Sequence, residues 1–198
     1  MEWGGHQRGC KPSTPAKSNL FNQENDDKKL NDIESDVYHS VIQKLMYICK
    51  RAKPDIKPAL SYLCTKVSCP SIDDKEKFDR LLDYLHGTIN DQRTLGATSL
   101  DEMITWVDFS FAVHANKRSH TGGTISFGVG VVHAKSSKQK LNTKSSTEAK
   151  LMGVSKYLPH HIWIVIFLKS QGYDVKSKIL YQDNESAIKM EKNGLVLQ

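Results

Sequence analysis

Three acidic residues that lie far apart in the chain have the local context expected of a divalent-metal site. Asp108 and Asp183 each end an apolar run, and Glu148 opens a helix-like segment. Carboxylates at strand ends and at a helix start can meet at one edge of a sheet, and hard cations such as Mg²⁺ prefer clustered oxygen ligands. Each acid taken singly is more typical of a solvated turn or a helix cap. Together they indicate a two-magnesium site of the kind used in phosphoryl chemistry.

The elements that must position these acids have a strand-rich pattern from residue 103 onward. Short apolar runs separated by glycine-rich turns predict strands, and longer apolar stretches predict helices, with a break at Pro159. In chain order the expected elements are three strands, two helices, a strand and a helix: 104–109, 122–128, 129–134, 146–158, 162–168, 178–182 and 184–191. This order predicts an α/β fold of the α+β type, with a mixed sheet and helices on its faces.

The preceding segment has helical periodicity. One apolar stripe recurs at helical spacing over Val37, Val41, Leu45 and Ile48, and Pro54 ends that helix. A second helix is expected over 55–67 and a third from Pro70 to Gly87, whose core face is formed by Phe78, Leu81, Leu82 and Leu85. Residues 1–35 have little to bury and predict a mobile tail. The expected domains are therefore the tail 1–35, a helical region 36–95 and a strand-rich domain 100–198.

Composition sets broad limits on the function. The chain has 198 residues and a net charge of +6, with a pI near 9.0, which suits a polyanionic partner but is also common in other proteins. Four cysteines without a CxxC pair indicate reduced thiols of an intracellular protein: Cys10, Cys49, Cys64 and Cys69. The longest apolar run, 162–168, is far shorter than the roughly 20 residues that span a bilayer, so no membrane partner is expected.

Three stretches of the C-terminal half carry a family resemblance. Residues 135–140, 145–149 and 182–187 resemble the ribonuclease H region at the end of the Ty1/copia-type retrotransposon polyprotein. Upstream, residues 38–48 and 51–56 look like the segment that follows the reverse transcriptase palm in the same polyproteins. The resemblance covers the chain from about Pro12 to Gly194.

The resemblance implies a ribonuclease H-like fold and metal-dependent cleavage of the RNA strand in RNA·DNA hybrids. Two Mg²⁺ ions, for which Mn²⁺ substitutes, would bridge the scissile phosphate. The implied partners are the RNA·DNA hybrid and the remainder of the retroelement polyprotein. The implied location is intracellular, in the cytoplasm or the nucleus.

The resemblance also assigns the metal ligands, one of them ambiguously. Asp108 would be the shared ligand on the first strand, and Asp183 the ligand at the end of the fourth. The helix ligand is either Glu148 or Lys150, which lie about 200° apart around a helix and so cannot both face one metal pair. The match to the family pattern favours position 150. There an ammonium would replace a carboxylate and weaken or abolish cleavage.

Two family features are missing from the sequence. The fourth carboxylate and the last strand follow the Gly194 region in the family, so we expect a C-terminally truncated domain that is a partial or decayed copy. The paired aspartates of a polymerase, normally within Tyr-x-Asp-Asp, are also missing. The adjacent aspartates of this sequence, Asp26-Asp27 and Asp73-Asp74, lie in polar surroundings. DNA synthesis by this chain alone is therefore excluded.

A basic run leads into the site helix. Its four lysines are either a solvated loop or contacts to hybrid phosphates: Lys135, Lys138, Lys140 and Lys144. The histidines of this half are interpreted as structural or surface groups, and Trp106 and Trp163 as core residues. Two functions from different classes remain open. One is a ribonuclease H, and the other is a non-catalytic nucleic-acid-binding module or an inert retroelement relic.

Overall fold

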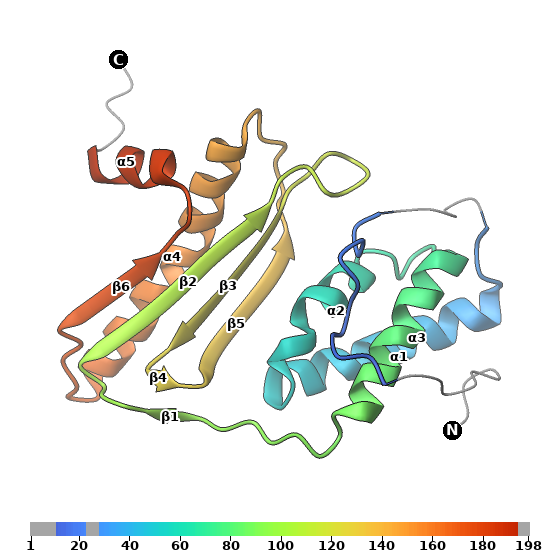
Figure 1. Ribbon diagram of the computed structural model, residues 1–198, viewed down its shortest axis with the longest axis horizontal. Helices are drawn as coiled ribbons and strands as arrows, with labels where there is room; N and C mark the ends of the chain where they lie inside the picture. The colour runs from blue at the N-terminus through green and yellow to red at the C-terminus, as the bar shows by residue number, and fades with distance from the viewer. Residues whose placement is uncertain (1–10, 23–27, 194–198) are drawn as a thin grey trace. The chain divides into compact units, whose positions relative to one another are not determined.

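The N-terminal unit is built from helices that bury one side each. The computed structural model describes residues 11–22 and 28–193, with side chains to residue 189, and the chain divides into two units between Arg93 and Thr94. The helices of the first unit are α1 (Asp32–Arg51), the 3-10 helix η1 (Pro54–Ile56), α2 (Lys57–Cys64) and α3 (Ile72–Gly87) (Figure 1). The second helix expected over 55–67 is thus divided into η1 and α2. Pro54 opens η1, because the first helical position needs no N–H donor.

The buried stripe of α1 differs from the expected one. Four of its residues are buried: Tyr38, Ile42, Leu45 and Cys49. Val37 and Ile48, which were expected to face inward, are 36% and 40% exposed. Both stripes have helical spacing, and the larger aromatic side chain decides between them because it buries more apolar surface. Tyr38 packs on Phe78 with ring centroids 5.1 Å apart, and its hydroxyl donates to the Leu63 carbonyl at 3.2 Å.

α3 confirms the expected third helix. Ser71 Oγ accepts a hydrogen bond from the Asp74 N–H at 3.2 Å, and the Asp74 carboxylate accepts one from the Ser71 N–H at 3.0 Å. This reciprocal pair is a capping box, which satisfies two backbone donors at the helix start. Phe78 and Leu81 are buried, and the helix ends at Gly87.

Residues 11–22 and 28–31 differ from the mobile tail expected for residues 1–35. Leu20 is buried, and the ring of Phe21 meets the ring of Tyr62 edge-on, with centroids 5.5 Å apart. These apolar residues have a core to pack against, although the segment around them is polar. Cys49, Cys64 and Cys69 are free thiols, as expected. Two features singled out in the sequence lie outside the described residues: Cys10 and Asp26-Asp27.

The second unit is a four-stranded mixed sheet with a long helix across one face (Figure 1). The strands lie in the order β5 (Val131–Lys138), β3 (His120–Ser126), β2 (Glu102–Ser110) and β6 (Ser177–Tyr181). β6 is parallel to β2, and the other neighbours are antiparallel. Two-residue strands β1 (Gly96–Ala97) and β4 (Gly128–Val129) form a separate pair, and α4 (Ser146–Ser170) and α5 (Glu185–Asn193) complete the unit. The protein is thus a mixed α/β protein with a mixed sheet.

The two faces of the sheet differ in what they meet. On β2, Met103, Thr105 and Val107 are buried, whereas Trp106 and Asp108 are exposed on the opposite face. The buried face lies under α4, where Thr105 Oγ1 is 2.8 Å from His161 Nδ1. The alternation follows from the two-residue period of a strand. Trp106, expected in the core, is instead 42% exposed.

α4 is one continuous helix where the sequence predicted two. It passes through Pro159, which lacks a backbone N–H, but Tyr157 and His161 on either side are buried and hold both halves on the sheet. By length and composition alone, α4 is long and apolar enough to cross a membrane, a property that the short run 162–168 did not predict. Its outer side carries Trp163, which is 63% exposed rather than in the core. The Gly194 region, after which the missing last strand was placed, lies outside the described residues.

Candidate metal and nucleic-acid site

Asp108 lies within β2 near its C-terminal end, and Asp183 lies just beyond the C-terminal end of the neighbouring strand β6. The parallel register of β2 and β6 pairs Trp106 with Tyr181, and each aspartate comes two residues later. Parallel strands bring residues of equal register to the same edge of a sheet. Asp108 is exposed there, and its Oδ1 accepts a hydrogen bond from the Phe109 N–H at 2.7 Å.

Lys150 reaches this edge from α4. Its ammonium donates a hydrogen bond to Asp183 Oδ1 and lies 5.0 Å from the centroid of the Phe109 ring. The Lys150 side chain is only 10% exposed, whereas that of Asp183 is 71% exposed. The hydrogen bond from Lys150 lowers the pKa of Asp183, since it stabilises the charged carboxylate. The Lys150 ammonium is therefore already paired with Asp183, one of the two carboxylates at this edge.

Glu148 is engaged at the start of α4. Its Oε2 accepts a hydrogen bond from the Lys144 N–H at 2.6 Å, and its own N–H donates to Ser145 Oγ at 3.1 Å. Ser145 is the N-cap of the helix, so this arrangement is a variant of the capping box. The Glu148 carboxylate therefore caps the helix, and the side chain that contacts Asp183 is that of Lys150.

The residues at this edge, as arranged, do not fit a pair of magnesium ions. Two-metal catalysis needs several carboxylates that share the ions between them. Among the described residues, no group of three or more His, Cys, Asp or Glu side chains is placed to hold a metal. The Lys150 ammonium on Asp183 has the wrong charge for a metal ligand and repels a cation. Magnesium at this edge stays a prediction that depends on position 150.

The four lysines of the basic run take different positions. Lys135 lies on the α4 side of β5, where its Nζ is 2.8 Å from His160 Nε2. Lys138 lies three residues after Lys135, and side chains an odd number of residues apart on a strand face opposite sides of the sheet. Lys138 is the register partner of His120 and therefore faces away from α4. Lys140 follows the end of β5, and Lys144 precedes the N-cap of α4. Lys156 on α4, which the sequence analysis did not single out, has a pKa lowered by burial and then by Lys140 and Lys135.

The histidines of this unit are held in structural contacts. His120 Nδ1 is 3.0 Å from His114 Nε2, and His120 Nε2 is 2.7 Å from Ser136 Oγ. Burial, and secondarily Lys138, lowers the pKa of His120 to about 4. His120 is therefore neutral at physiological pH, as a buried hydrogen-bonding group should be.

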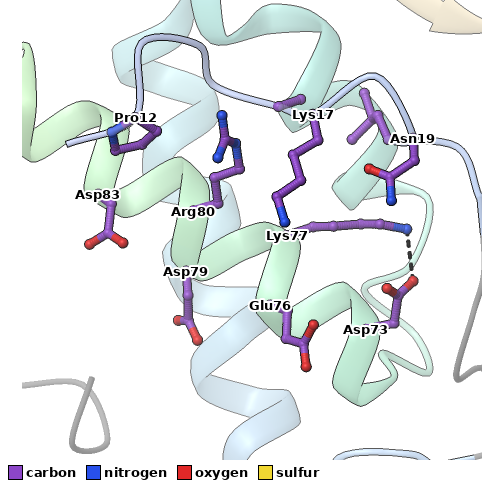
Figure 2. A pocket seen from close by; sticks show the side chains of 11 residues that line it. Pro12, Lys17, Asn19, Asp73, Glu76, Lys77, Asp79, Arg80 and Asp83 are labelled. Carbon is purple, nitrogen blue, oxygen red and sulfur yellow. Dashed lines mark hydrogen bonds and ion pairs between the residues drawn. The ribbon is translucent and has the colours of Figure 1, made fainter. Parts of the chain in front are cut away.

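A separate cavity of about 520 Å³ lies in the N-terminal unit, between residues 12–20 and α3 (Figure 2). Acidic and basic side chains share its walls. Lys77 forms an ion pair with Asp73 at 2.7 Å, drawn as the dashed line in Figure 2, and Arg80 lies along the same helix. Charges of both signs at close range neutralise one another, so this cavity suits a polyanion poorly.

The curated proteins that this chain is similar to include a retrotransposon polyprotein and a secreted effector protein. It is 29% identical over 159 residues to the retrovirus-related Pol polyprotein from transposon TNT 1-94 of Nicotiana tabacum, an alignment that covers 80% of this chain and 12% of that polyprotein. It is 25% identical over 130 residues to the secreted RxLR effector protein 161 of Plasmopara viticola, which covers 65% of this chain and 92% of that protein. No protein-family model and no solved structure matches. The similarity supports a retrotransposon polyprotein as the source of this domain, of which the chain spans a small part.

Proposed function

We propose that this chain is a ribonuclease H-type domain of Ty1/copia origin that binds RNA·DNA hybrids without cleaving them. Similarity to a retrotransposon polyprotein supports the origin. The order of the longer elements, three strands, a helix, a strand and a helix, supports the ribonuclease H-type architecture. Asp108 on β2 and Asp183 just after β6 lie at the same end of neighbouring strands, which supports it further. The observation that carries the proposal is the contact between the Lys150 ammonium and Asp183.

This contact opposes cleavage for an electrostatic reason. Hydrolysis of a phosphodiester at such an edge depends on divalent ions that activate water and stabilise the leaving oxygen. To admit an ion at Asp183, the Lys150 ammonium must move or lose its proton. The Lys150 side chain is largely enclosed, which limits how far its ammonium can move away from the Asp183 carboxylate. The ion pair is therefore the stable state of this edge.

Hybrid binding does not require the metal. Phosphate contacts by lysine release counterions and supply sequence-independent affinity. The chain has a net charge of +6, and lysines flank the helix that crosses the sheet. The proposed activity is thus retention of a hybrid along this unit with its RNA strand intact.

The test combines a binding and a cleavage measurement on one substrate. The full chain is titrated into a short fluorescein-labelled RNA·DNA hybrid, and binding is measured by fluorescence anisotropy. The same mixture is analysed on a denaturing gel with Mg²⁺ or Mn²⁺. We expect salt-sensitive binding and no cleavage by the native chain.

Variants at position 150 make the test specific. Lys150→Glu should show metal-dependent cleavage above the native level, whereas Lys150→Gln, which removes the charge without adding a ligand, should not. Cleavage by the native chain that is lost on Asp108→Asn would overturn the proposal in favour of an active nuclease. A folded chain that binds no hybrid would instead indicate an inert relic.

A further inference from the structure

Two side-chain contacts show that β5 runs along one flank of α4. At the end of the strand, Gln139 Nε2 donates to the Ala149 carbonyl at 2.9 Å. Earlier in the strand, Lys135 Nζ lies 2.8 Å from His160 Nε2, three turns further along the helix. Strand and helix therefore run in opposite directions, and residues of α4 between these two contacts lie beside residues 135–140.

Lys156 is on this flank. It stands four residues before His160, and residues four apart share a helix face. His160 contacts Lys135 on β5, so Lys156 faces the same strand. The neighbouring Tyr157 is buried over Gly123 of β3, which fixes the rotation of the helix. Lys156 is half-buried, and burial followed by Lys140 and Lys135 lowers its pKa.

The two contacts place Lys135, Lys140 and Lys156 along the same flank, and the charges of Lys135 and Lys140 act on Lys156. Within residues 11–22 and 28–193, Lys135, Lys140 and Lys156 form no ion pair with an aspartate or glutamate. Like charges at close range destabilise the fold unless an anion offsets them. An ammonium has three donors and His160 takes one from Lys135, which leaves donors on every lysine for an incoming oxygen.

We propose that Lys135, Lys140 and Lys156 form a phosphate-binding cluster for the backbone of a nucleic acid, and that His160 orients Lys135. This inference rests on the proposed function, because it names the surface on which the hybrid is held. The cluster contains only two of the four lysines of the basic run, Lys135 and Lys140. Lys138 faces the opposite side of the sheet, Lys144 lies at the helix start, and Lys156 joins from a different element.

The experiment compares two triple variants with equal net charge. The cluster variant carries Lys135→Ala, Lys140→Ala and Lys156→Ala. Its matched control carries Lys169→Ala, Lys176→Ala and Lys178→Ala, which remove the same charge from the end of α4 and the start of β6 in the same unit. Binding of the labelled RNA·DNA hybrid is measured over a series of salt concentrations, and circular dichroism and thermal midpoints confirm that each variant is folded.

The expected result is specific to the cluster. The slope of log K against log salt should fall by about 2 to 3 in the cluster variant, and affinity at low salt should fall by at least about tenfold, because each lost phosphate contact removes roughly 0.9 from the slope. The control should keep the native slope. If the cluster variant is destabilised, Lys156→Gln alone should lower the slope by about 0.9.

The outcomes separate the two proposals. Equal slopes and affinities for the cluster variant and its control would overturn the phosphate cluster and leave the proposed function standing. A native chain that binds no hybrid at any salt concentration would overturn both. Loss of binding in the two triple variants alike would show a diffuse charge effect and would also overturn the cluster.

Discussion

The indole of Trp106 stacks on the phenol ring of Tyr181, with ring centroids 5.9 Å apart and ring planes at 20°. The two residues are register partners on β2 and β6, and Asp108 and Asp183 follow them by two residues. Both rings are partly exposed, so the pair lies on the open face of the sheet. The stack holds the two strand ends together, and with them the two carboxylates that the ribonuclease H interpretation depends on.

The first prediction concerns this aromatic pair. A double-mutant cycle with Trp106→Ala and Tyr181→Ala should give a coupling free energy of roughly 0.5 to 1 kcal/mol, since stacked aromatic pairs contribute about this much beyond the area they bury. The free energy of unfolding of each protein is measured by urea denaturation. A coupling energy of zero would mean that the rings do not hold the strands in register.

The second prediction uses two adjacent glycines on opposite faces of β3. A Cβ at Gly123 would lie 2.5 Å from Tyr157 Cε2, whereas a Cβ at Gly122 meets nothing within 4 Å. Tyr157 is buried and cannot retreat, so Gly123→Ala should lower the free energy of unfolding by roughly 1 to 3 kcal/mol. Gly122→Ala should leave it unchanged or slightly higher. Similar effects of the two substitutions in urea denaturation would refute the assignment of faces.

The third prediction is a pH dependence of stability that arises at His120. Its pKa falls from 6.5 to about 4 in the folded chain, mainly because it is buried. Between these values the unfolded chain binds the proton and the folded chain does not. The free energy of unfolding should therefore fall as the pH drops from 6.5 toward 4, by up to roughly 3 kcal/mol. Burial also lowers the pKa values of His160 and His161, which act in the same direction.

Histidine variants isolate this contribution. His120→Asn should show a shallower fall of stability with pH than the native chain, measured by urea denaturation across the same range. His39→Asn, at an exposed position of α1, should keep the native dependence. The groups that surround His120 are His114, Ser136 and Lys138, and they remain in both variants. An identical pH dependence for His120→Asn and the native chain would contradict the prediction.

Much of the element order followed from residue patterns, and the failures have physical causes. The strand β2 and the apolar face of α3 were predictable because each follows a clear apolar pattern, whereas the side of β2 that faces the core was not, since Trp106 is exposed. The stripe of α1 was misplaced by one residue, because two stripes share the same spacing and the ring of Tyr38 outweighs Val37. The break expected at Pro159 failed because buried neighbours on both sides hold the helix on the sheet.

The ambiguity between positions 148 and 150 had a different cause. Large apolar residues usually show which side of a helix is buried, but the first turns of α4 meet the sheet through small residues. Ala149 and Gly153 are buried, and a Cβ at Gly153 would lie 3.1 Å from Thr121 Cγ2. Close approach selects small side chains, and position 150 is beside this face. Lys156 was not predicted as a binding residue, because its neighbours Lys135 and Lys140 lie in and just after β5, a different part of the chain.

Divalent-ion binding tests most directly whether Lys150 disables this edge. Isothermal titration calorimetry with Mg²⁺ and Mn²⁺ is carried out on the native chain, Lys150→Gln and Lys150→Glu. We expect no binding by the native chain, because the Lys150 ammonium holds Asp183, and binding by Lys150→Glu that disappears when Asp108→Asn is added. Metal binding by the native chain as tight as that of Lys150→Glu, and lost on Asp183→Asn, would contradict the blocked site and restore the nuclease interpretation.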